Sequence, residues 1–135
     1  MRGLLLILLF GLSACAELPI NPSSGPTAGG SAGVSQEEME AEARSGTAEA
    51  VSELVASSRT SRTSGDYAHA LADIERAIRI EPRNPYLWLE LGETHLALDD
   101  RQQAAATARK AMSVAGADRT AKAAAEDLLE RASGY

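Results

Sequence analysis

Three side chains carry a thiol or an imidazole, the groups that most readily act as nucleophiles, general bases or soft metal ligands: Cys15, His69 and His95. Cys15 is the only cysteine among 135 residues, so it has no disulfide partner and no second thiol for a metal site. The histidines fall in segments of helical periodicity, His95 at a packing position and His69 on the wetted side. Motifs of serine hydrolases, P-loops, zinc proteases and CxxC redox pairs are absent from the sequence. We therefore expect no enzyme activity, no metal, no cofactor and no small-molecule substrate.

The acidic residues are the next candidates for chemistry, but their placement favours a structural role. The pairs Glu37-Glu38 and Asp99-Asp100 stand where helices are expected to begin, and negative charge is stabilising there. The run SRTSRTSG at 58–65 could be a phosphorylation site or a basic patch, and is better explained as the end of a helix and its turn. The net charge of −6 argues against nucleic acid as a partner, because phosphate binding requires clustered Lys and Arg.

Cys15 ends the apolar run LLILLFGLSAC, residues 5–15. Arg2 supplies a short positive region before it, and Leu4 to Leu12 form the apolar region that signal peptides require. A membrane-spanning helix needs about 20 apolar residues, and this run has roughly half that number. The pattern therefore predicts a signal peptide over residues 1–14.

The last four residues of the run, Leu12-Ser13-Ala14-Cys15, resemble the lipobox of bacterial lipoproteins. In that family the cysteine sulfur receives a diacylglycerol, the chain is cleaved before the cysteine, and the new N-terminus is acylated. The resemblance implies that Cys15 carries a covalent lipid anchor. Ala16 stands where inner-membrane members of the family commonly carry Asp, which implies the outer membrane with the domain facing the periplasm. An ordinary signal peptide with a chance cysteine is the alternative.

Residues 15–35 are predicted to be a disordered tether. Eleven of the twenty residues in AELPINPSSGPTAGGSAGVS, which follows Cys15, are Pro, Gly or Ser. Such a segment buries too little apolar surface to offset the entropy lost on ordering.

Residues 36–135 have the periodicity of an all-α domain. Ser35 and Glu38 match a capping box at the start of the first helix, which Gly46 is expected to break or bend. Capping and helix-breaking residues delimit the later helices: Pro82, Asn84-Pro85, Asp99-Asp100, Gly116 and Asp118.

The helices also repeat with a period of 34 residues, which places Ala70, Ile74 and Ala77 opposite Ala104, Ala108 and Ala111. The pattern resembles the tetratricopeptide repeat. Its positions are occupied by Gly65, Tyr67, Ala70, Ile74, Ala77 and Pro82 in one repeat and by Trp88, Leu91, Gly92, Ala104 and Ala111 in the next. The sequence departs from the repeat pattern at two places, Ser57-Ser58 and His95. The resemblance implies antiparallel helix pairs in repeats 51–84 and 85–118, a short solenoid, and a capping helix over 119–133.

The same resemblance implies that the first helix of each repeat lines a groove that binds a protein. The corresponding positions are Ser52, Val55, Arg59 and Arg62 in the first repeat and Tyr86, Leu89, Glu93 and Leu96 in the second. An apolar strip beside two arginines suits a partner with an apolar anchor and a carboxylate. In the alternative arrangement, Leu89 and Leu96 pack beneath residues 36–50.

The order of lipobox, tether and short repeat domain resembles the lipoprotein activators of bifunctional penicillin-binding proteins. That resemblance implies an adaptor that binds a periplasmic peptidoglycan synthase and stimulates cell-wall synthesis. Two alternatives remain at this stage. One is a pilotin-like lipoprotein that assists assembly of a secretin or pilus, and the other is a structural envelope lipoprotein that self-associates.

Overall fold

The computed structural model describes residues 35–134, and this part of the chain is entirely helical, with five helices. The helices are α1 (Gln36–Thr63), α2 (Tyr67–Ile80), α3 (Pro85–Ala97), α4 (Arg101–Val114) and α5 (Arg119–Ser133). The predicted all-α fold is therefore confirmed. Cys15, the signal peptide and the predicted tether up to residue 34 lie outside the described residues. None of the five helices is both long enough and apolar enough to cross a membrane.

Each helix begins at a polar residue whose side chain accepts a hydrogen bond from a backbone N–H of the first turn. In the predicted capping box, the Glu38 carboxylate also accepts a hydrogen bond from the backbone N–H of Ser35 at 2.9 Å. The capping residues are Ser35, Asp66, Asn84, Asp100 and Asp118. These local bonds explain why the sequence located the helix starts.

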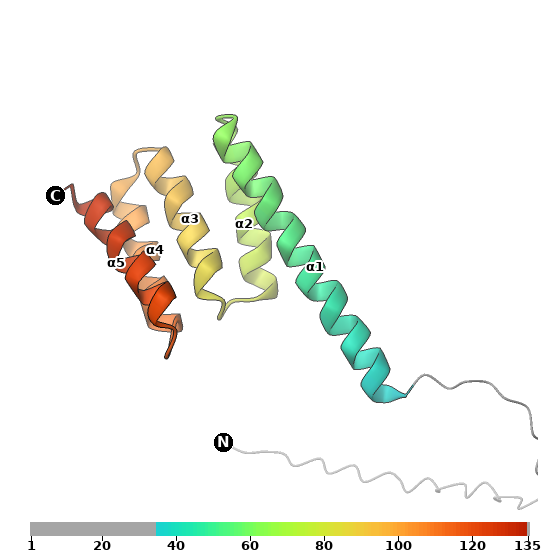
Figure 1. The fold of residues 1–135 in the computed structure, drawn as a ribbon. Helices are drawn as coiled ribbons and strands as arrows, with labels where there is room; N and C mark the ends of the chain where they lie inside the picture. Colours follow the sequence, from blue (N-terminus) through green and yellow to red (C-terminus); the bar gives the residue numbers. More distant parts are fainter. Residues whose placement is uncertain (1–34, 135) are drawn as a thin grey trace, which may run out of the picture. The chain divides into compact units, whose positions relative to one another are not determined.

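The predicted break at Gly46 is wrong, because α1 continues through it as one 28-residue helix. A glycine costs a helix about 1 kcal/mol relative to alanine, and the surrounding Ala and Glu residues favour the helix strongly enough to offset that. All side chains of residues 36–50 are exposed, so this first half of α1, here called the overhang, contributes nothing to the core. The overhang projects past the end of α2 (Figure 1).

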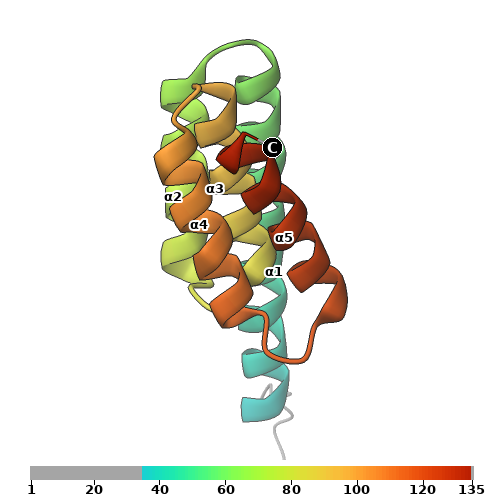
Figure 2. The ribbon, with the colours of Figure 1, turned by 90° about the vertical axis from the view of Figure 1, so that its left-hand side faces the viewer.

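The helices pack as antiparallel pairs, α1 with α2 and α3 with α4, and α5 covers the second pair. Helix α3 also contacts α1 on one side and α5 on the other, so α1, α3 and α5 are neighbours in that order. Figure 2 shows the same stack from its α5 end, with the overhang extending below it. The architecture is that of the predicted short solenoid, with α5 in the capping position.

The core joins larger apolar side chains at one end to small ones at the other. Val51, Ile74 and Leu87 form a cluster between α1, α2 and α3. Trp88, which the repeat resemblance places in the core, is only half-buried, and its indole N–H donates to the Pro82 carbonyl at 2.9 Å. Buried alanines and one leucine fill the space between α4 and α5: Ala104, Ala108, Ala111, Ala121, Ala125, Leu128 and Ala132.

Gly92 lies where α3 packs tightly against α4 and α5. A Cβ atom placed there would lie 2.5 Å from Leu128 Cδ2 and 2.8 Å from Thr107 Oγ1. Leu128 is fully buried and Thr107 nearly so, which leaves neither side chain room to retreat. The glycine therefore sets how closely α3, α4 and α5 can pack.

We expect Gly92→Ala to lower the free energy of unfolding by about 1–3 kcal/mol, the usual cost of overpacking a filled core. Gly46→Ala is the matched control, because nothing lies within 4 Å of its Cβ position. It should raise stability by about 0.5–1 kcal/mol through better helix propensity. Urea unfolding followed by circular dichroism measures both. An unchanged midpoint for Gly92→Ala would contradict the close packing.

Candidate functional site

The face formed by α1, α3 and α5, here called the first-helix face, carries most of the predicted groove residues. Arg59 is exposed on α1 and Arg62 is half-buried one turn later. Val55 does not line the face freely, because it packs against the core cluster. On α3, Tyr86 is 46% exposed, and Leu89, Glu93 and Leu96 are half-buried.

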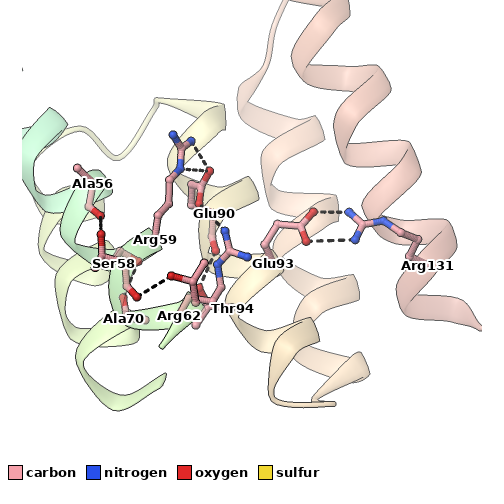
Figure 3. Close-up of polar contacts among 11 residues, drawn as sticks. Ala56, Ser58, Arg59, Arg62, Ala70, Glu90, Glu93, Thr94 and Arg131 are labelled. Atoms are coloured by element: carbon pink, nitrogen blue, oxygen red, sulfur yellow. Dashed lines mark hydrogen bonds and ion pairs between the residues drawn. The ribbon is translucent and has the colours of Figure 1, made fainter. Parts of the chain in front are cut away.

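One carboxylate that the sequence analysis missed, Glu90, joins α3 to α1. The Arg59 guanidinium donates to Glu90 Oε1, with Nε at 2.8 Å, and Arg62 Nη2 lies 3.4 Å from Oε2 (Figure 3). The Glu90 side chain is only 14% exposed, so these bonds are partly shielded from water. The hydrogen bond that Arg59 donates to Glu90 raises the pKa of Arg59 above its usual value. The predicted arginine pair thus already has a carboxylate partner within the chain.

A second ion pair joins α3 to α5. Arg131 of α5 donates to both carboxylate oxygens of Glu93, with Nη1 at 3.1 Å from Oε2, as Figure 3 shows. Asp127 also accepts from Arg131 Nε at 2.9 Å. The bond to Glu93 is the main cause that raises the pKa of Arg131. Glu93 pairs with Arg131 of the capping helix, and its predicted contact with a partner stays a prediction.

Tyr86 forms a third link across the face. Its hydroxyl donates to Asp118 at 2.9 Å, and Asp118 is the residue that caps α5. The pKa of Asp118 is lowered first by the backbone N–H of Ala121 and then by the Tyr86 hydroxyl. The same bond raises the pKa of Tyr86. Together the three links bridge α1, α3 and α5, and Tyr86 stays exposed.

No residue of the overhang is buried against the first-helix face. The alternative in which Leu89 and Leu96 pack beneath residues 36–50 disagrees with the structure, because every residue of that segment is exposed. The contact of these two leucines with a partner remains a prediction.

The two histidines lie apart, on different helix pairs. His69 Nδ1 is 2.6 Å from the Asp66 carboxylate at the start of α2, on the exposed side as expected. His95 is half-buried in α3, and its Nδ1 has no hydrogen-bond partner among residues 35–134. Within the same residues, no group of three His, Cys, Asp or Glu side chains is arranged to hold a metal ion. The face described above is thus the better candidate for function.

Comparisons with known proteins agree with this geometry. The family model described as tetratricopeptide repeat matches residues 54–84 and 85–118, which correspond to the α1/α2 and α3/α4 pairs. A solved structure of the globular C-terminal domain of LpoP from P. aeruginosa is similar, with 33% sequence identity and a TM-score of 0.59. The match covers 61% of this chain and 77% of that one. A search of curated proteins finds no match.

The link between Tyr86 and Asp118 can be tested by titration. Because Asp118 has a lowered pKa in the folded chain, it adds stability above its unfolded pKa of about 3.9, and this is lost as pH falls through the folded value. Tyr86→Phe should move the Asp118 pKa part of the way back up, since the Ala121 N–H still donates. Carboxyl NMR measures the shift, with Tyr67→Phe on α2 as the control. Equal Asp118 titrations in the two variants would refute the link.

Proposed function

The chain belongs to the tetratricopeptide-repeat family, and on that basis we propose that it is a protein-binding adaptor of the bacterial cell envelope. The observation that carries this proposal is the likeness to the C-terminal domain of LpoP, at 33% identity over 77% of that domain. The architecture that resembles the activators of bifunctional penicillin-binding proteins supports a more specific role. The partner is a periplasmic peptidoglycan synthase, and the adaptor stimulates it.

The first-helix face is suited to such binding because its helices are already held in place. Its links run from Glu90 to α1, from Glu93 to α5 and from Tyr86 to the start of α5. A surface ordered before binding loses little conformational entropy when the partner arrives. The accessible Tyr86 ring beside half-buried Leu89 is the kind of aromatic anchor on which binding energy concentrates.

Stimulation follows if the synthase exchanges between a less active and a more active conformation. A partner that binds the active conformation more tightly shifts the population toward that conformation. The size of the shift is set by the difference between the partner's affinities for the two conformations. The adaptor then needs no catalytic group of its own. This mechanism agrees with the sequence, which lacks catalytic motifs.

The proposed place of action is the periplasmic face of the outer membrane. Cys15 is the proposed lipid attachment site, and two or more acyl chains suffice for stable anchoring. Residues 16–34, rich in Pro, Gly and Ser, are the proposed tether between the lipid and the domain.

We expect Tyr86→Ala and Arg59→Ala each to weaken binding to the purified bifunctional synthase, Tyr86→Ala by about tenfold or more. Both residues are exposed, so the domain should keep its helical content. Arg109→Ala on the exposed side of α4 is the matched control and should bind like the parent. Surface plasmon resonance and a glycan polymerisation assay measure the two effects. If a secretin binds and the synthase does not, the pilotin-like role replaces the activator role.

The anchor is tested separately. Cys15→Ala should abolish labelling with radioactive palmitate and release the protein from the outer-membrane fraction, because no other residue is proposed to carry lipid. Ser23→Ala in the predicted tether is the control and should leave labelling unchanged. Palmitate labelling that persists in Cys15→Ala would refute lipidation at this residue.

A further inference from the structure

A hollow lies between α1 and α2, formed by residues that the first-helix face does not use. Its volume is about 380 Å³. Leu54 and Ile80 supply its apolar walls, and the Ser57 hydroxyl donates to Asp73 at 2.6 Å at its edge. The lining residues are Ala50, Glu53, Leu54, Ser57, Asp73, Arg76 and Ile80. We call this the end hollow.

The two ends of the repeat stack differ in how they are closed. At the α5 end, Ala121, Ala125 and Leu128 of α5 are buried, and the outer side of α5 presents the exposed residues Lys122 and Glu126 to water. At the α1/α2 end, no helix within residues 35–134 plays that part, and Ile80 remains 41% exposed. Solenoid ends normally need a polar outer face for solubility. The end hollow therefore lies at the end of the stack that no helix of residues 35–134 covers.

The overhang gives this surface a strong charge. The overhang ends at Ala50, which lines the hollow together with Ile80, and it projects beyond α2 (Figure 1). The overhang has a single cation, Arg44. Its Nη2 atom lies 3.9 Å from Glu40 Oε2, and the two side chains form a weak and highly exposed ion pair. The overhang and the lining of the hollow carry seven carboxylates and two cations, Arg44 and Arg76; the carboxylates are Glu37, Glu38, Glu40, Glu42, Glu49, Glu53 and Asp73.

We propose that the end hollow and the overhang together bind a cationic amphipathic helix of a partner protein. An apolar side chain of that helix enters the hollow between Leu54 and Ile80, and its Lys and Arg residues lie along the overhang. Helix-in-groove recognition combines these two elements, with apolar anchors for affinity and complementary charge for orientation and rate. The proposal does not require the synthase, because the hollow and the first-helix face share no residue.

Charge argues against the two occupants that this chain could supply. A second copy would bring a net charge of −6 and its own acidic overhang against this one. The predicted tether, residues 15–35, contains Glu17 and neither Lys nor Arg, so it cannot complement the overhang. A basic helix from another protein meets no such repulsion.

The test is photo-crosslinking in cells that produce the full chain, with p-benzoylphenylalanine replacing Ile80 and mass spectrometry of the crosslinked peptide. The parallel probe at Ala123 on the exposed side of α5 gives the background. Two charge-reversed forms are compared, Glu42→Lys/Glu49→Lys in the overhang and the matched Glu126→Lys/Glu130→Lys in α5. All four positions are exposed, so the fold should be unaffected, which circular dichroism checks.

The proposal expects an adduct at Ile80 to a segment of another protein with an excess of Lys and Arg and one apolar helical face. Its yield should fall at least about fivefold with the overhang reversal, a loss in the range of exposed charge pairs, and stay unchanged with the α5 reversal. An adduct to a second copy, to residues 15–35 or to an acidic or neutral segment overturns it. So does a yield no higher than that at Ala123, or equal sensitivity to both reversals. A failed synthase-binding assay at the first-helix face would leave this result standing.

Discussion

The close approach of α3 to α4 and α5 at Gly92 is the constraint on which the rest of the domain depends. With few aromatic residues available, the second repeat fills its core with alanines, and alanine cores require short distances between helices. The absent Cβ of Gly92 gives Leu128 and Thr107 the space they occupy. The links from Glu93 to Arg131 and from Tyr86 to Asp118 can span from α3 to α5 because the backbones are this near.

The features predicted from the sequence are those with local causes. Helix starts were found because a single Asp, Ser or Asn satisfies the first backbone N–H groups, as at Asn84 and Asp118. The repeat was found because small residues recur where helices touch. Gly46 was misjudged because glycine is a weak signal inside a helix whose neighbours favour helix formation.

The features that were missed depend on residues far apart in the sequence. Glu90 looked like an ordinary surface charge until the fold placed it against Arg59 and Arg62, about thirty positions earlier. Arg131 is 38 residues from Glu93, and nothing local pairs them. Leu87 and Trp88 are adjacent, and only the packing against α2 decided that the leucine is buried and the indole half-exposed. Spacing along one helix therefore predicts a face, and only tertiary contacts show which charges on it are already paired.

The continuous α1 has a mechanical consequence. The overhang of fifteen residues places its first residue about 22 Å from the packed body of the domain. A pull applied to the chain at Ser35 acts along the axis of α1. The load then shears α1 along α2 over their whole contact instead of peeling the two helices apart turn by turn. Shear spreads force over many side chains at once, so the domain should keep its shape under tension that would open a helix pair pulled from a short loop.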